Sequence, residues 1–193
     1  GLAMTEIGRF PIATGASAVG AGDVNEDGLP DLVVTGDSNR SIHVLLGNGS
    51  GGFTALAPSS DGTLARELAL THLDCDGHLD LVLVDYAFGG VHVLRGRGDG
   101  TFEASTTYAT GGRTSALDVG DVNDDGVPDV VATEPDAAGV HVLFGLGGAV
   151  LGGDTFLSVG ASALNGVVAA DLDGNGTLDL AVSDPSEVSV LLR

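Results

Sequence analysis

The sequence contains no lysine and no tryptophan, and its only fixed positive charges are seven arginines. Aspartate and glutamate together number 27, so the 193-residue chain has a formal net charge of −20. A surface this acidic repels phosphate groups, and we therefore expect neither nucleic acids nor anionic membranes as partners. The single cysteine, Cys75, excludes an internal disulfide framework and a zinc site built from several cysteines.

Long hydrophobic runs are also missing, since none approaches the roughly 20 residues that a membrane-spanning helix needs. Disorder is not expected, because 43% of the residues are hydrophobic. The length suits one domain with a sizeable core, and we assign residues 1–193 to a single domain with no membrane insertion.

What the sequence does contain is an internal repeat. Four acidic, glycine-containing segments align, and their first residues are separated by 49, 49 and 50 positions. These loops are residues 23–31, 72–80, 121–129 and 171–179. Two apolar runs follow each loop, and in three copies a glycine-rich turn and a phenylalanine come next. Recurrence at one period is the mark of a repeat architecture.

Each repeat predicts four short strands. In the first repeat they are Ser17–Gly22, Leu32–Thr35, Ile42–Leu46 and Phe53–Ala57. Runs of Val, Leu and Ile bounded by Gly, Asp, Asn and Pro are typical of strands. The second and third strands are apolar at nearly every position, as expected when both faces of a sheet are covered. Four antiparallel strands in a period near 50 predict one blade of an all-β propeller.

The ends of the sequence predict how such a propeller could close. The chain begins with a fourth-strand segment around Phe10 and ends with a third-strand segment at Leu192. The N-terminal strand could therefore complete the last of four blades and remove an exposed sheet edge. A ring formed by two chains, or a longer array of blades, remains the alternative.

The acidic loops follow the pattern D-x-[DN]-x-[DN]-G-x-x-D. Side-chain oxygens at positions one, three, five and nine, with the backbone carbonyl at position seven, form the oxygen-rich shell that Ca²⁺ prefers. Glycine at position six allows the positive φ that turns the chain around an ion.

This pattern predicts three or four Ca²⁺ sites. In the complete loops the ligands are Asp23, Asn25, Asp27, the Leu29 carbonyl and Asp31; Asp121, Asn123, Asp125, the Val127 carbonyl and Asp129; and Asp171, Asp173, Asn175, the Thr177 carbonyl and Asp179. The second loop offers only Asp74, Asp76, the His78 carbonyl and Asp80. His72 replaces its first aspartate, and because imidazole is a poor Ca²⁺ ligand we expect weaker binding there, or none.

Two other interpretations of the loops were weighed. An EF-hand needs a glutamate at position twelve and flanking helices, but position twelve is Val34, Leu83, Ala132 or Val182, so an EF-hand is rejected. A single Asp-Asn-Gly cluster is often just a solvated turn. Four copies in phase favour a metal, because two carboxylates ~4 Å apart repel by ~4 kcal/mol at an effective dielectric constant near 20.

The chain resembles the FG-GAP (integrin α-subunit-like) and VCBS repeats. The resemblance rests on these loops, the apolar strand that follows each of them and the Leu-Gly-Asn-Gly-x-Gly-x-Phe type of turn. The resemblance extends from about Phe10 to Leu192. It implies a β-propeller whose blades hold Ca²⁺ between their first and second strands. The departures are His72, a lengthened turn at residues 145–155 and a low number of blades.

Other residues were considered for chemistry. His43, His92 and His141 occupy one repeat position, where we favour local packing in the third strands over a shared metal site. Cys75 is not expected to act as a nucleophile. Arg95 and Arg97 form the only local basic pair, which we expect to be solvated or paired with Asp99.

The expected function is that of a non-catalytic, calcium-binding module in an extracellular or cell-surface protein, which recognises a protein or a glycan. A lectin that binds sugars between blades is the alternative, and a polysaccharide lyase is less favoured because cationic groups are few. We expect recognition to lie in the variable loops at residues 37–40, 86–90 and 146–154, in a monomer or a ring-completing homodimer.

Overall fold

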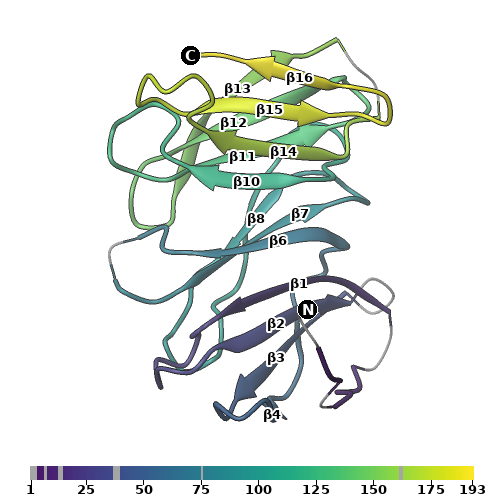
Figure 1. The fold of residues 1–193 in the computed structure, drawn as a ribbon, viewed down its shortest axis with the longest axis vertical. Helices are drawn as coiled ribbons and strands as arrows, with labels where there is room; N and C mark the ends of the chain where they lie inside the picture. Colours follow the sequence, from purple (N-terminus) through teal and green to yellow (C-terminus); the bar gives the residue numbers. More distant parts are fainter. Residues whose placement is uncertain (1–3, 7, 13–14, 37–39, 75, 161–162) are drawn as a thin grey trace.

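The computed structural model describes residues 4–6, 8–12, 15–36, 40–74, 76–160 and 163–193. Within these residues the secondary structure is all β, and the strands form four antiparallel sheets (Figure 1). No helix in this part of the chain could cross a membrane.

The first two sheets hold the strands up to Tyr108. The first contains β1 (Ala16–Gly22), β2 (Asp31–Gly36), β3 (Ser41–Gly47) and β4 (Phe53–Ala55), with the short β5 (Ser59–Ser60) also paired to β3. The second contains β6 (Ala65–Thr71), β7 (Asp80–Asp85), β8 (Val91–Leu94) and β9 (Thr106–Tyr108).

The other two sheets repeat this order. The third contains β10 (Leu117–Gly120), β11 (Asp129–Glu134), β12 (Gly139–Gly145) and β13 (Leu151–Ser158). The fourth contains β14 (Gly166–Ala170), β15 (Asp179–Ser183) and β16 (Val188–Leu191). The four strands predicted for the first repeat are confirmed to within two residues at each end. The lengthened turn is shorter than expected, because β13 begins at Leu151.

The sheets are arranged in a row in which each contacts the next. Their first strands lie side by side, with β6 between β1 and β10, and β10 between β6 and β14 (Figure 1). This is a propeller-like arrangement of four sheets in sequence order.

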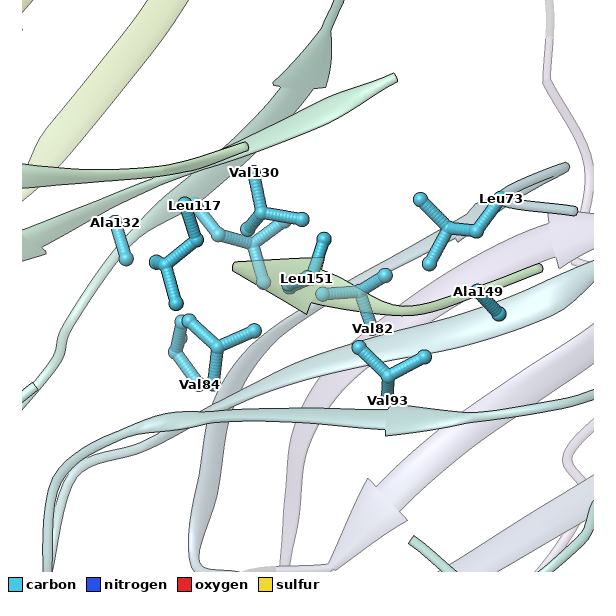
Figure 2. Packing of buried hydrophobic residues seen from close by; sticks show 11 residues of the cluster. Leu73, Val82, Val84, Val93, Leu117, Val130, Ala132, Ala149 and Leu151 are labelled. Carbon is cyan, nitrogen blue, oxygen red and sulfur yellow. The ribbon is translucent and has the colours of Figure 1, made fainter. Parts of the chain in front are cut away.

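The core consists of three apolar clusters, one between each pair of neighbouring sheets. Side chains of β7 alternate between two of them: Leu81 and Leu83 face the first sheet, whereas Val82 and Val84 face the third. Figure 2 shows the middle cluster, where strands of the second and third sheets bring their valines and leucines together. The prediction that both faces of the second strands are covered is therefore confirmed for β7.

Glycines allow the sheets to approach one another. At Gly22, the last residue of β1, an added Cβ would lie 2.7 Å from Leu79 Cδ1 of the next repeat. At Gly120, the last residue of β10, it would lie 2.7 Å from Leu178 Cδ1. Side chains at these positions would push the neighbouring leucines out of the sheet interface.

The prediction that the N-terminal strand closes the last blade is wrong in this structure. Phe10 lies outside the strands and packs edge-on against Phe53 of the first sheet, with ring centroids 5.1 Å apart. The fourth sheet, at the other end of the row, has three strands within the described residues. The N-terminal segment therefore contributes its aromatic ring to the sheet nearest in sequence, and the described chain forms an open row.

Candidate metal-binding loops

The four acidic loops join the first and second strands of their sheets, as predicted. In each, the glycine at position six has a φ between 83° and 92°; these residues are Gly28, Gly77, Gly126 and Gly176. An added Cβ at any of these positions would meet nothing within 4 Å. The glycine is therefore required by the backbone conformation alone, since residues with a side chain rarely adopt this φ.

The ninth residue of every loop is a buried aspartate that fastens the loop to the sheet. These residues are Asp31, Asp80, Asp129 and Asp179, all at most 1% exposed. In each, Oδ2 accepts the N–H of the second loop residue at 2.9–3.0 Å. Oδ1 accepts an N–H from the end of the third strand at 2.8–2.9 Å. The sequence pattern assigned this residue to a metal and gave no sign of its structural role.

The first aspartate of the three complete loops shapes the turn. Asp23, Asp121 and Asp171 each accept the N–H of the fifth residue on Oδ1 and the N–H of the glycine on Oδ2, at 2.7–3.1 Å. These bonds direct the backbone N–H groups at the carboxylate and hold the loop in a compact form.

The fourth loop brings three of its predicted ligand carboxylates close together. Oxygen atoms of Asp171, Asp173 and Asp179 lie within 4.8 Å of one another, and within the described residues this is the only such group of three acidic, histidine or cysteine side chains. No described basic side chain forms an ion pair with any of the three. The backbone N–H groups of Arg193 and Leu172 lower the pKa of Asp179, which favours its charged form.

The first and third loops differ from the fourth at position three, where they carry an asparagine. Asn25 Nδ2 donates to Asp27 Oδ2 at 3.0 Å, and Asn123 Nδ2 donates to Asp125 Oδ2 at 2.9 Å. One carboxylate in each loop thus accepts a hydrogen bond from an amide, and the three acidic groups are not gathered as they are in the fourth loop. Burial raises the pKa of Asp129 in the third loop.

The second loop satisfies its polar groups with protein atoms. His72 Nδ1–H donates to the His78 carbonyl at 2.8 Å, so the predicted position-seven ligand is taken up by the imidazole that replaced the first aspartate. Arg95 Nε lies 3.7 Å from Asp74 Oδ2. The Arg95 guanidinium thus places a positive charge beside the predicted ligands of this loop.

The pKa values in the second loop reflect the same arrangement. Burial raises the pKa of Asp74, and the neighbouring Asp76 adds to this effect. The backbone N–H of His78, which Asp76 Oδ1 accepts at 2.8 Å, lowers the pKa of Asp76. A hydrogen bond to Glu26 of the first loop raises the pKa of His78 and links the two loops.

The other residues singled out in the sequence are an arginine, the cysteine, a variable loop and three histidines. Arg95 pairs with Asp74 and not with Asp99, because the turn after β8 places it against the second loop. Cys75 and residues 37–39 lie outside the described residues. Local packing of the three repeat histidines is confirmed: all are buried, and each bonds to nearby groups, as His43 does to Ser41 at 2.7 Å.

The donor set of the three complete loops fits a calcium ion. Ca²⁺ takes roughly six to eight oxygen ligands with loose geometry, and each loop offers only carboxylate, amide and carbonyl oxygens. In loop four these would be Asp171, Asp173, Asn175, Asp179 and the Thr177 carbonyl. A bound ion would offset the repulsion among the carboxylates and tie together strands that now meet only through hydrogen bonds.

Comparisons with known proteins agree with this geometry. The sequence signature of the FG-GAP-like repeat matches residues 72–132 and 121–182, which together make up more than half of the chain. No curated protein matches the sequence.

Several solved structures resemble this fold, and two of them are a fungal lectin and a bacterial toxin. A lectin of Agrocybe aegerita, described for specific recognition of non-reducing terminal N-acetylglucosamine, has a TM-score of 0.61 and 23% identity over 89% of this chain and 48% of the lectin chain. The Tc holotoxin pore of Photorhabdus luminescens has a TM-score of 0.54 and 20% identity over 89% of this chain and 8% of the toxin chain. The present chain thus spans about half the length of the lectin.

Proposed function

Because the chain belongs to the FG-GAP-like repeat family, we propose that it is a non-catalytic module whose acidic loops bind Ca²⁺ and stiffen a row of propeller-like sheets. Loops 23–31, 121–129 and 171–179 each take one ion, and loop 72–80 takes none. The module presents a surface that recognises a protein or a glycan outside the cell or at its surface.

The observation that carries this proposal is the set of uncompensated carboxylates in loop four. Three side chains offer oxygens within 4.8 Å of one another, and no described basic side chain pairs with them. Backbone N–H groups stabilise two of these carboxylates, but the mutual repulsion of all three favours a bound cation. Calcium outside cells is abundant enough to fill sites of micromolar or weaker affinity, which supports an extracellular or cell-surface location.

Isothermal titration calorimetry with CaCl₂ on the chelator-treated chain tests the proposal. We expect three ions per chain, and substitution of Asp173→Ala should reduce the number by one. Absence of any calcium-dependent heat at millimolar concentrations would overturn the calcium role.

A lectin is the second candidate, and the likeness to the fold of the Agrocybe aegerita lectin favours it. Aromatic platforms for sugars are scarce, since the chain has two tyrosines, six phenylalanines and no tryptophan. A glycan array probed with the calcium-loaded chain separates the two candidates: binding to a defined glycan supports a lectin, and binding to none leaves a protein ligand. A polysaccharide lyase is less favoured than either, and no release of unsaturated uronate, followed by ultraviolet absorbance, is expected.

For the oligomeric state we propose a second copy of the chain as the partner that completes a ring. Valines are exposed in the two sheets at the ends of the row: Val19 on β1 is 64% exposed, and Val168, Val188 and Val190 of the fourth sheet are each more than half exposed. The chain also covers only 48% of the similar lectin. Light scattering should give twice the mass of one chain, whereas the mass of a single chain would contradict this assignment.

A further inference from the structure

At one repeat position, on the side of the sheets away from the acidic loops, the second repeat has a residue unlike those of the other three. The position is occupied by Ser17, Arg66, Ser115 and Asn165. The serines and the asparagine are small and bond to the neighbouring second strand: Ser17 contacts Thr35 Oγ1 at 3.0 Å, Ser115 contacts Thr133 Oγ1 at 2.9 Å, and Asn165 accepts from Ser183 at 2.9 Å. Arg66 cannot make this short contact, and its side chain turns elsewhere.

The Arg66 guanidinium lies over the ring of Tyr86, 4.6 Å from the centroid. Both residues line a cleft of about 490 Å³ whose other walls include Arg113, Ser115, Asp136 and Asn165. We call this the Arg66 cleft. It lies where the second, third and fourth sheets come together, and Arg66 and Tyr86 also line a neighbouring cleft of about 380 Å³.

The two arginines of the Arg66 cleft differ in charge balance. Arg113 is held by Asp136 through two bonds, from Nε at 2.8 Å and from Nη2 at 2.6 Å, so this pair is neutral. Among the described residues, no carboxylate lies within ion-pair distance of Arg66. In a chain of net charge −20, Arg66 thus presents an uncompensated guanidinium to a cavity, and a fork of N–H donors matches a carboxylate.

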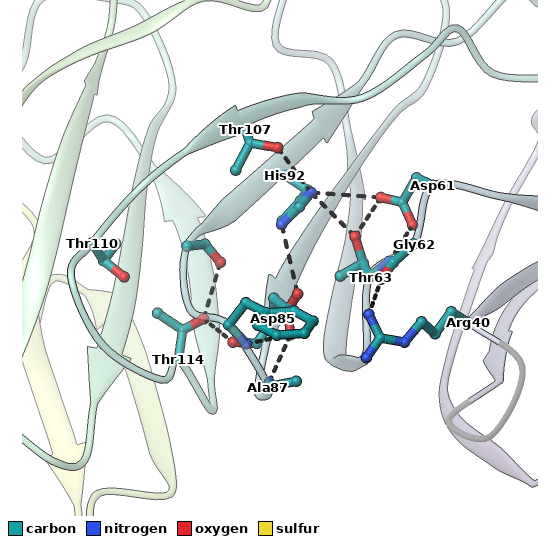
Figure 3. Close-up of polar contacts among 12 residues, drawn as sticks. Arg40, Asp61, Gly62, Thr63, Asp85, Ala87, His92, Thr107, Thr110 and Thr114 are labelled. Atoms are coloured by element: carbon teal, nitrogen blue, oxygen red, sulfur yellow. Dashed lines mark hydrogen bonds and ion pairs between the residues drawn. The ribbon is translucent and has the colours of Figure 1, made fainter.

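The turn that carries Tyr86 is held in place before any ligand arrives. Asp85 Oδ1 accepts the N–H of Ala87 at 2.6 Å and that of Phe88 at 3.2 Å. Thr114 Oγ1, from the next repeat, bonds to the carbonyl groups of Asp85 and Gly90, both at 3.0 Å (Figure 3). A ligand that stacks near this turn would therefore lose little free energy in ordering it.

The rest of the lining consists of groups that bind hydroxyls. The Tyr86 hydroxyl accepts Arg113 Nη1–H at 3.4 Å, which leaves its own proton to donate. Asp136 retains acceptor lone pairs beyond the two bonds it makes to Arg113. Asn165 is exposed at the cleft and has an amide N–H₂ to donate.

We propose that the Arg66 cleft binds a carboxylate-bearing sugar, a uronic acid residue of a glycan, with its carboxylate on Arg66 and its hydroxyls on Tyr86, Asp136 and Asn165. The inference rests on the glycan-recognising form of the proposed function and names its ligand class. A carboxylate has one negative charge and matches the single uncompensated guanidinium, whereas a phosphate monoester has more negative charge than this cleft balances. The cleft volume is within the range of small-ligand sites, roughly 300–1,000 Å³.

Ligand-observed NMR titrations of the calcium-loaded chain with D-glucuronate, D-glucose and acetate test the proposal. We expect D-glucuronate to bind about tenfold more tightly than either D-glucose or acetate, because only it engages both Arg66 and the hydroxyl-binding groups. The same titrations are run on Arg66→Ser, Arg66→Lys and Arg97→Ser. Serine is the native residue at the equivalent positions 17 and 115, so the fold should tolerate it.

Arg66→Ser should lower glucuronate affinity to the level of D-glucose, and Arg66→Lys should retain part of the difference because it keeps the charge and loses the fork. Arg97→Ser changes the net charge by the same amount outside the cleft and should leave binding unchanged. Equal affinities for glucuronate and glucose, equal affinities for glucuronate and acetate, or an equal loss in Arg97→Ser would each overturn the proposal. Calcium stoichiometry measured on the same samples tests the proposed function separately, since a chain that binds three ions but no glucuronate refutes only this cleft.

Discussion

Loop two and loop four have the same backbone course but balance their charges in opposite ways. In loop four, three carboxylates face one another with no basic side chain beside them among the described residues. In loop two, the His72 imidazole bonds to the position-seven carbonyl, and Arg95 lies beside Asp74. The difference shows that the repeat keeps its shape with a histidine in place of the first aspartate, because protein groups bond to the polar atoms of the loop.

What the two loops share is the buried ninth aspartate. Asp80 and Asp179 bind the same two kinds of backbone N–H at nearly the same distances. The fold thus depends on this residue whether or not the loop binds an ion. In the proposed function, the aspartates earlier in the loop are the residues that distinguish a loop that binds Ca²⁺ from one that does not.

The largest effect is expected at the shared residue. Asp80→Ala would leave two N–H groups, those of Leu73 and Gly96, without their acceptor, which should lower the free energy of unfolding by about 3–5 kcal/mol. Urea unfolding in EGTA measures this. Asp76→Ala, in the same loop but exposed, should cost under about 1 kcal/mol, and similar losses for both variants would refute the distinction.

The next largest effect is the rise in melting temperature that Ca²⁺ causes, to which loop four should contribute and loop two should not. Each filled site should add about 2.7 kcal/mol at a calcium concentration 100 times its dissociation constant. Millimolar Ca²⁺ should therefore raise the melting temperature of the native chain above its value in EGTA. Asp171→Asn should remove one site's share of this increase, and Asp74→Asn should remove none. Equal melting temperatures with and without calcium would contradict the account.

A third prediction attempts to convert loop two. His72→Asp restores the first aspartate and releases the His78 carbonyl, so the number of bound calcium ions should increase by one in calorimetry. Arg95 remains beside Asp74 and should keep the new site weaker than the others, and the double variant with Arg95→Ser should strengthen it. If neither variant changes the number of ions, the assignment of loop two as a loop lacking its metal because of His72 is wrong.

The smallest effect is expected for Glu67, a carboxylate outside the loops. It tests how protonation alters stability in the absence of calcium. Burial raises the pKa of Glu67, and the nearby Asp118 adds to this, while the Leu117 N–H that Glu67 accepts opposes it. A raised folded-state pKa means that the folded chain holds the proton more tightly. The stability from this group is therefore present below its ordinary pKa and is lost as the pH rises through the raised value.

Glu67→Gln should for this reason stabilise the chain at pH 7, by under about 1 kcal/mol because the side chain is only half-buried. The gain should shrink as the pH falls towards 4.5, the ordinary value for this group. Thermal melts in EGTA across this range measure it, and a gain that grows towards low pH would show that the sign is wrong.

Much of the fold could be predicted from the sequence because the same residue pattern recurs in each repeat. The loop positions, the strands around them and the covered faces of β7 were predicted from phase and apolar runs alone. The prediction that the strand around Phe10 closes the last blade was wrong, because a phenylalanine at the right phase fits equally well in a strand or as a ring packed on Phe53. Pairing across the ends of the row is a long-range property that no local pattern encodes.

The candidate site was predictable in its residue types and less so in their roles. The spacing of Asp171, Asp173 and Asp179 indicated a cluster, and the structure brings these three together. It did not indicate that the ninth aspartate binds two backbone N–H groups. One donor lies seven residues earlier in the loop itself, and the other lies 14–16 residues further along the chain, beyond the reach of the loop pattern. The Arg66 cleft was missed for the same reason, since its walls belong to three different repeats.

Crystals grown with calcium test the central claim most directly, through the anomalous difference density in the four loops. The account predicts one ion in each of loops 23–31, 121–129 and 171–179, and none in loop 72–80. Water alone beside Asp27, Asp125 and Asp173, or an ion of equal occupancy beside Asp74, would contradict it.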